Sequence, residues 1–258
     1  MKKGILFISI ILLVGILAAC GDSEAESSDE GDANGDKVLK MATSADFPPF
    51  ESRDPEGNFE GFDIELATII AEELGYDLEI EDMSFDGLIG ALQADRVDMV
   101  MAGMSTTDKR RKNVDFSNEY NHSGETFIFN PDATIESLED LEGKTVGVQL
   151  GTIQEEGADK LSEEYGFEVK KVDDAGILVQ ELNSNRIDVG YMDKTVAKGY
   201  MDEQGFAGFD DPTTASPGMG IAFPKGSDLV EQVNDVLAQL EESGELDELK
   251  DKWLSDYQ

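Results

Sequence analysis

The same order of strand-like and helix-like segments occurs twice along this chain. Residues 38–101 alternate short apolar segments with amphipathic ones, and residues 145–192 repeat that order. The letters repeat too: Gln93-Ala-Asp-Arg-Val-Asp-Met-Val100 corresponds to Asn183-Ser-Asn-Arg-Ile-Asp-Val-Gly190, 90 residues further on. Strands that alternate with helices form mostly parallel sheets with right-handed crossovers. Two copies are too few for a solenoid, so the sequence predicts two similar α/β lobes.

Hydrophobic periodicity locates the individual elements. Short apolar or alternating segments predict strands, and longer amphipathic stretches predict helices. The expected strands are 38–43, 77–82, 97–101, 145–149, 168–172, 187–192 and 220–223, and the expected helices are 62–74, 85–94, 152–165, 175–183, 228–241 and 245–253.

The last two helices need a sheet to cover, and we assign them to the first lobe. The chain then crosses between the lobes twice, near residues 121–125 and 215–220. A double crossing forms a hinge, which suits closure around a ligand. We therefore expect one lobe made of residues 37–122 and 218–258, and a second lobe made of residues 123–217.

The N-terminus has the pattern of a secretory signal peptide. Lys2 and Lys3 precede an apolar segment, residues 4–17, which is shorter than the roughly 20 residues that span a bilayer. An uncleaved membrane anchor is the alternative. Leu17-Ala-Ala-Cys20 resembles the lipobox of bacterial lipoproteins, which implies a signal peptide of residues 1–19 and acylation of Cys20, for example by palmitate. Residues 21–36 contain no large apolar side chain, so we expect residues 20–36 to be a lipidated cysteine followed by a disordered acidic linker.

Composition excludes several classes of function. The chain carries 57 acidic and 20 basic residues, a formal net charge of −37, which opposes binding to nucleic acid. Cys20 is the only cysteine and His122 the only histidine, so there is no internal disulfide and no zinc site built on several such residues. Nothing around His122 resembles a nucleophile elbow. We expect no catalytic residue, no metal and no cofactor.

Candidate ligand contacts follow the predicted strands of both lobes at their carboxyl ends, where ligands gather in open parallel sheets. In the first lobe these positions are Ser44, Asp46, Phe47, Gly103 and Ser105, and in the second lobe they are Gln149, Gly151, Thr152 and Asp193.

A basic cluster, residues 109–112, stands out in this acidic chain. Thr106 or Thr107 can cap a short helix there, and free backbone N–H groups, the Ser105 hydroxyl and an arginine would suit a carboxylate. Asp193 across a cleft would suit an ammonium group, so the set matches a zwitterion. A solvated basic turn is the alternative, and spacing alone does not distinguish Arg110 from Arg111.

With these residues assembled, the chain resembles the periplasmic-type solute-binding proteins of polar amino-acid ABC transporters (solute-binding protein family 3). The similarity covers nearly all of residues 38–256. The matching motifs include Ala-Thr-Ser-Ala-Asp-Phe-Pro-Pro-Phe-Glu at 42–51 and Phe-Asp-Gly-Leu-Ile-Gly-Ala-Leu at 85–92. The others lie at 61–66, 96–98, 102–116, 141–152, 186–193 and 220–226.

The resemblance implies a type II periplasmic-binding-protein-like clamshell, with mostly parallel sheets flanked by helices and two hinge crossovers. It also implies roles for individual residues. Arg110, Ser105 and the backbone amide of Ile153 would hold the ligand α-carboxylate; Asp193 and the backbone of Gly103 would hold the α-amino group; and Phe47 and Phe85 would flank the side chain. Several relatives carry an aspartate where this chain has Ser44. We expect Asp46, two residues on, to substitute for it, and Gln149 and Thr152 complete the set.

We therefore expect an extracytoplasmic receptor, anchored to the cell membrane by lipidated Cys20. It would bind a polar or cationic amino acid, act as a monomer without nucleic acid, and deliver its ligand to an ABC permease with its ATPase subunit. Two other classes stay open. An enzyme on the same clamshell would need an acid–base pair in the cleft, and a sensor module would need an output partner.

Overall fold

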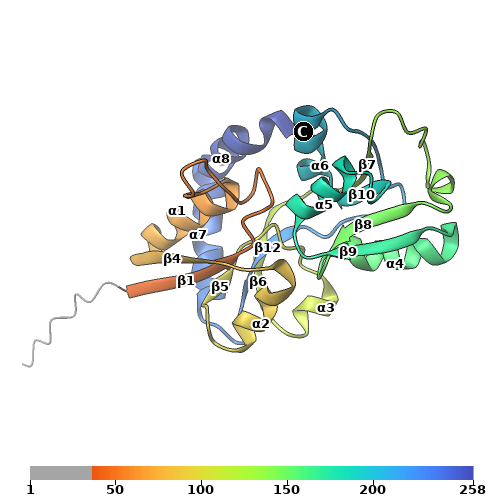
Figure 1. The fold of residues 1–258 in the computed structure, drawn as a ribbon. Coiled ribbons are helices and arrows are strands. Elements are labelled where there is room, and N and C mark those ends of the chain that lie inside the picture. The colour runs from red at the N-terminus through yellow and green to blue at the C-terminus, as the bar shows by residue number, and fades with distance from the viewer. Residues whose placement is uncertain (1–36, 258) are drawn as a thin grey trace, which may run out of the picture. The chain divides into compact units, whose positions relative to one another are not determined.

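The computed structural model describes residues 37–257, which form two five-stranded sheets (Figure 1). The first sheet has the order β4-β1-β5-β12-β6, with β4 Tyr76–Asp82, β1 Lys37–Thr43, β5 Met99–Val100, β12 Met219–Phe223 and β6 Asp115–Asn121. The second has the order β11-β7-β10-β8-β9, with β11 Ala207–Asp210, β7 Glu125–Phe129, β10 Val189–Asp193, β8 Thr145–Gln149 and β9 Glu168–Val172. A hairpin pairs β2 Ser52–Arg53 with β3 Phe59–Glu60. We call each large sheet with the helices packed on it lobe 1 and lobe 2.

Both sheets combine a parallel part with an antiparallel part. Strands β4, β1 and β5 run parallel, as do β9, β8 and β10. These are the six strands of the predicted repeat. The pairs made by β12 with β5 and β6, and by β7 with β10 and β11, are antiparallel. The predicted fold class is confirmed, and the expected parallel order holds within each repeat.

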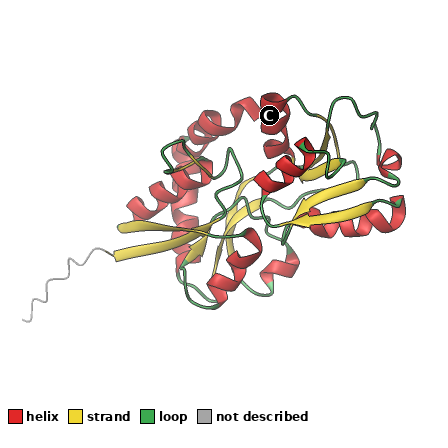
Figure 2. Cartoon of the chain, in the orientation of Figure 1, coloured by secondary structure: helices red, strands yellow, loops and turns green. Residues whose placement is uncertain are grey.

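Helices cover both sheets (Figure 2). On lobe 1 lie α1 Phe62–Leu74, α2 Leu88–Gln93, which continues a 3-10 turn at Phe85–Gly87, α7 Leu229–Ser243 and α8 Glu245–Leu254. On lobe 2 lie α4 Ile153–Tyr165, α5 Ala175–Asn183 and α6 Lys194–Gln204. The short helix α3 Asp108–Arg111 follows β5, and 3-10 turns occur at Leu138–Leu141 and Ser255–Tyr257.

The helix ends follow local chemistry. The Thr107 hydroxyl accepts a hydrogen bond from the Arg110 amide and caps α3, which decides between Thr106 and Thr107. The Thr152 hydroxyl accepts from the Glu155 amide (3.1 Å) and caps α4. Helix α1 ends at Gly75, whose φ of 72° is the left-handed conformation that glycine adopts without strain.

The apolar core joins the two lobes. One buried cluster contains Leu39 and Met41 of β1 and Phe62 of α1, and it also contains Leu178 of α5 and Val196 of α6. Separate clusters lie between the first sheet and α2, and between the second sheet and α4. The lobes therefore pack against each other along one side in addition to being joined by the chain.

The chain passes between the two sheets twice, at residues 122–124 after β6 and at residues 211–218 after β11. Strands β6, β7 and β11 and helix α6 were not predicted. Strand β6, Asp-Phe-Ser-Asn-Glu-Tyr-Asn, is mostly polar, and α6 contains Gly199, so neither shows clear periodicity. Strand β5 is also shorter than the predicted segment 97–101.

Within residues 37–257 no helix is long and apolar enough to cross a membrane. The predicted signal peptide, Cys20 and the acidic linker lie outside the described residues.

Candidate ligand-binding site

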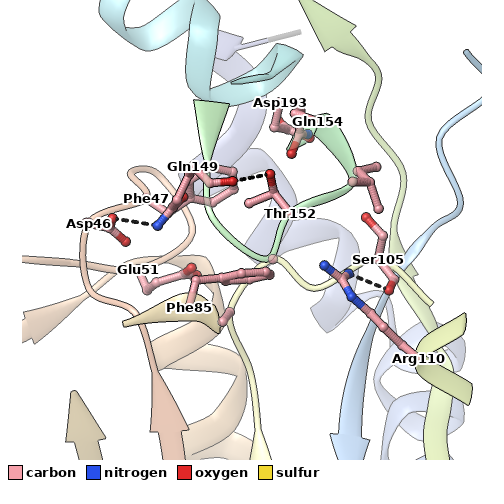
Figure 3. Close-up of a pocket in the computed structure, with 13 residues that line it drawn as sticks. Asp46, Phe47, Glu51, Phe85, Ser105, Arg110, Gln149, Thr152, Gln154 and Asp193 are labelled. Atoms are coloured by element: carbon pink, nitrogen blue, oxygen red, sulfur yellow. Dashed lines mark hydrogen bonds between the residues drawn. The ribbon is translucent and has the colours of Figure 1, made fainter. Parts of the chain in front are cut away.

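A pocket lies where the carboxyl ends of strands from both sheets meet (Figure 3). Lobe 1 contributes side chains from the segments after β1, β4 and β5, and lobe 2 contributes them from the ends of β8 and β10. The lining residues are Asp46, Phe47, Glu51, Phe85, Ala102, Gly103, Ser105, Arg110, Gln149, Thr152, Ile153, Gln154 and Asp193.

Arg110 is a buried cation. Only 8% of it is exposed, because α3 turns its side chain inward. Its guanidinium donates to the Ser105 carbonyl (2.8 Å) and, across the lobes, to the Gly151 carbonyl (2.9 Å), and it lies over the Phe85 ring. Burial lowers the pKa of Arg110 to about 10. Within residues 37–257 no carboxylate lies within ion-pair distance of it, so the site can accept an anionic group.

Asp193 ends β10 and caps α6. Its Oδ1 accepts from the Ser123 hydroxyl (2.9 Å) and from the amides of Thr195 (2.8 Å) and Val196 (3.3 Å). In the described part of the chain, no side chain or amide donates to Oδ2. Burial raises the pKa of Asp193 to about 6, so the group is mostly ionised at neutral pH. An unused carboxylate oxygen at the pocket suits an ammonium group.

Asp46 bridges the lobes. Its Oδ2 accepts from the Gln149 side chain (3.0 Å) and from the Ala175 amide at the start of α5 (2.6 Å). Its Oδ1 accepts from the Ser44 hydroxyl (2.9 Å). Burial raises the pKa of Asp46 to about 6. Ser44 does not line the pocket, and it contacts the site only through Asp46.

Glu51 is a second acidic group at the pocket. It is completely buried, and neither carboxyl oxygen has a hydrogen-bond donor among the described residues. Burial, with the neighbouring Asp63 carboxylate, raises the pKa of Glu51 well above its usual range. Asp63 itself accepts from the Gly103 amide (2.8 Å) and the Tyr120 hydroxyl (2.9 Å), which fixes the loop after β5.

Two glycines allow close approach at the pocket. Gly103 has a φ of 54°, and a Cβ there would lie 3.0 Å from the Phe47 ring. Gly151 has a φ of 78°, and a Cβ there would lie 2.8 Å from the Asp86 Cα in the other lobe. At this contact only glycine lets the lobes come so close.

The structure gathers all the predicted ligand-binding residues except Ser44 around one pocket. Glu51, Ala102 and Gln154 line it too and were not among them. Glu51 returns to the pocket because Phe47 and Glu51 form a β-bridge across a tight turn. Gln154 directly follows Thr152 and Ile153 in the first turn of α4. This position next to two predicted residues was the only sequence feature that could have placed Gln154 at the pocket. Among residues 37–257 no group of three or more His, Cys, Asp or Glu side chains could hold a metal ion.

Two lobes with a polar pocket between them are the architecture of the type II periplasmic amino-acid-binding proteins, the class of the similar solved structures. Residues 39–256 match the family of bacterial extracellular solute-binding proteins, family 3, and the chain belongs to this family.

Relatives share most of their length with this chain. The arginine-binding extracellular protein ArtP of Bacillus subtilis (strain 168) is 43% identical over 99% of both chains. The L-cystine-binding protein TcyJ of Escherichia coli (strain K12) is 31% identical over 93% of this chain and 94% of TcyJ. An ancestral arginine-binding protein solved with arginine is 40% identical and has a TM-score of 0.79, covering 84% of this chain and 97% of the other.

Stability should fall as pH rises. Burial raises the pKa values of Asp46, Asp63 and Asp193 to about 6 and that of Glu125 to about 8. The unfolded chain, with pKa values near 3.8 and 4.5, ionises first. The stabilisation is complete below the unfolded pKa and is lost as pH passes the folded pKa. In 1 M NaCl, which screens surface repulsion, the ligand-free melting temperature should drop by at least about 5 °C from pH 5 to pH 8. A constant or rising melting temperature would show that these groups are not buried as described.

Proposed function

We propose that this protein is an extracytoplasmic, lipid-anchored receptor that binds a cationic amino acid, arginine foremost, between its two lobes and delivers it to an ABC permease. The observation that carries the proposal is the placement of charge in the pocket. Unpaired Arg110 lies on one side, acidic Asp46 and Glu51 lie on the other, and Asp193 lies above them (Figure 3).

The amino-acid head group would occupy the side with Arg110 and Asp193. The guanidinium of Arg110 has donors for a carboxylate, which could take over the two bonds it now makes to carbonyl oxygens. The free Oδ2 of Asp193 would accept from the ammonium group. Ser105 and the amide of Ile153, at the start of α4, lie on the same pocket wall. This division of roles is the one that the family resemblance implies.

The ligand side chain would point toward Asp46 and Glu51. Glu51 is buried, and neither of its oxygens has a hydrogen-bond partner among residues 37–257. It faces a pocket that the Phe47 and Phe85 rings also line. A guanidinium is planar, stacks on aromatic faces and offers several donors to a carboxylate, whereas an ammonium is a compact, strongly hydrated charge. The site therefore favours arginine over lysine. ArtP and the ancestral protein are both named as arginine-binding proteins, which supports the same choice.

Anchoring and delivery rest on the N-terminal sequence and on the family. The lipobox-like Leu17-Ala-Ala-Cys20 supports a lipid anchor on Cys20, and residues 20–36 would serve as the linker. Relatives that belong to amino-acid ABC transporters support a permease and its ATPase as partners. The two-sheet topology supports lobes made of residues 37–122 with 218–258 and of residues 123–217. A monomer would suffice as the clamp, because one chain supplies both walls of the pocket.

An enzyme is the second candidate, because one similar structure is described as an amino-acid-binding precursor of cyclohexadienyl dehydratase, 34% identical with a TM-score of 0.78. In an enzyme, the neighbouring buried carboxyls Glu51 and Asp63 would be the pair that exchanges a proton. The unpaired Arg110 opposite Asp193 favours binding of an intact zwitterion.

Binding of arginine should depend on Arg110. In a thermal-shift screen of the twenty amino acids, arginine should raise the melting temperature most, because a ligand that binds only the folded state stabilises it. Arg110→Ala should weaken arginine binding by about 100-fold or more, since a buried charge pair loses one partner. The arginine affinity of Arg110→Lys should lie between those of the wild type and Arg110→Ala, because lysine keeps the charge but lacks the bidentate fork.

Arg111→Ala is the matched control, since Arg111 is exposed and neighbours Arg110 in α3. It should change the affinity by less than about twofold. A screen in which no amino acid shifts the melting temperature would rule out the receptor function. Full binding by Arg110→Ala would refute the carboxylate assignment alone.

Closure of the lobes on the ligand should depend on Gly151. A Cβ at Gly151 would clash with Asp86 in the other lobe, so Gly151→Ala should weaken arginine binding by about tenfold, the equivalent of a modest steric penalty. Gly143→Ala is the control: Gly143 has a similar φ of 71°, but nothing lies within 4 Å of the added atom. Both variants carry the same backbone strain, so equal affinities in calorimetry would mean that this contact is not needed for binding.

A further inference from the structure

Glu125 is a buried acid that the proposed binding mode does not use. It is the first residue of β7, at the end of the first crossing between the lobes, and only 4% of it is exposed. Its Oε2 accepts a hydrogen bond from the Gln154 side chain, and its Oε1 is buried without a partner in the described part of the chain. Gln154 lines the pocket. Glu125 therefore lies directly behind a pocket residue.

Glu125 is also the neighbour of Asp193. The two residues are register partners on the antiparallel strands β7 and β10, and such partners project from the same face of a sheet. The charges around Glu125 are all acidic: Asp193 of β10 and Asp211 after β11. Tyr191 of β10, Gln154 of α4 and Ser216 of the second crossing are its neutral neighbours. Lys194 lies against the adjacent Gly124, but it pairs with Asp210 instead.

These surroundings disfavour a charged Glu125. Burial, with the charges of Asp193 and Asp211, outweighs the hydrogen bond from Gln154 and the nearby Ser216 hydroxyl and raises the pKa of Glu125 to about 8. At neutral pH the carboxyl is therefore mostly protonated. A cation that arrives beside Asp193 would reverse this balance, because a nearby positive charge favours the ionised form of an acid.

We propose that Glu125 is a positioning residue of the ligand site, which holds the Gln154 amide at the pocket wall and releases its proton to the solvent when a ligand ammonium group binds beside Asp193. The inference rests on the proposed function, because it needs a ligand with an ammonium group at Asp193. The affinity for the amino-acid ligand should then rise with pH as Glu125 loses its proton. Each proton released leaves one negative charge on Glu125, behind the pocket wall.

Glu125→Gln separates the charge from the hydrogen bond, because the amide oxygen can still accept from Gln154 but cannot titrate. Arginine affinity is measured by calorimetry for the full protein at pH 6.0 and pH 8.5. At pH 6.0 Glu125 is protonated in both states, so the variant should match the wild type within about twofold. At pH 8.5 Glu125→Gln should bind arginine about three- to tenfold more weakly than the wild type. This is the effect expected if ligand binding lowers the pKa of Glu125 in the wild type by roughly one unit.

Proton release gives a second, independent measure. Titrations at pH 7.5 in two buffers with different ionisation enthalpies should show fewer protons released by Glu125→Gln than by the wild type. Glu136→Gln, the same change at an exposed site on lobe 2, should release as many as the wild type. At pH 7.5 Asp46, Asp63 and Asp193, whose pKa values are about 6, are already mostly ionised, so the substitution changes mainly the proton held by Glu125.

Glu125→Ala tests the positioning role, because it also removes the acceptor for Gln154. It should bind arginine at least about threefold more weakly than Glu125→Gln at pH 6.0, the cost of one lost hydrogen bond. Equal affinities at pH 6.0 would refute the positioning role. The coupling between ligand binding and the Glu125 proton would be refuted if the ratio of wild-type to Glu125→Gln affinity were the same at both pH values and the two proteins released equal numbers of protons. A wild-type protein that binds no amino acid would instead refute the proposed function.

Discussion

The pocket is built around ionisable groups that are buried without an ion pair in the described part of the chain. Isolated ions in a protein interior cost several kcal/mol each, even after relaxation, yet Arg110 and Asp193 keep bonding capacity directed at the pocket. Glu51 keeps it too, with both oxygens unbonded and a raised pKa that disfavours its charge in the free protein. A zwitterion with a cationic side chain can satisfy all three. These unpaired groups destabilise the free protein, and a ligand that pairs with them gains that free energy on binding. The site is selective because a ligand that lacks one of the charges leaves a buried group unpaired.

The fold places these charges on opposite sides of a hinge. Two chain crossings and a shared apolar cluster join the lobes, and polar bonds from Asp46 and Arg110 span the pocket. The exposed pair Lys109–Glu156 spans it as well, although an exposed ion pair contributes little. Buried carboxyls in both lobes, Asp46 and Asp193, have raised pKa values. Closure of the lobes and the charge of the ligand should therefore both affect proton binding at this site.

Much of this arrangement could be predicted from local sequence. Helix α1 has the predicted bounds because amphipathic periodicity and Gly75 are local signals. The choice of Arg110 over Arg111 needed the family resemblance, since both share one short helix. Glu125 could not be recognised, because burial of an acid depends on partners that are distant in sequence, here Gln154 and Asp193. For Glu51 the sequence does not show its burial, which depends on the β-bridge to Phe47 and on packing beside Asp63. Strand β6 was missed because its polar residues are paired through the sheet and show no clear alternation.

The acidic end of the pocket should select a ligand with a cationic side chain. Comparison of the affinities for arginine and citrulline tests this selection most directly. Citrulline has nearly the same shape but carries a neutral urea group. Calorimetry should show that the wild type prefers arginine by about 30-fold or more, as expected for a buried charge pair. Glu51→Gln should lose most of that preference, while Glu56→Gln, at an exposed position, should keep it. Equal wild-type affinities for the two ligands, or an undiminished preference in Glu51→Gln, would contradict the account.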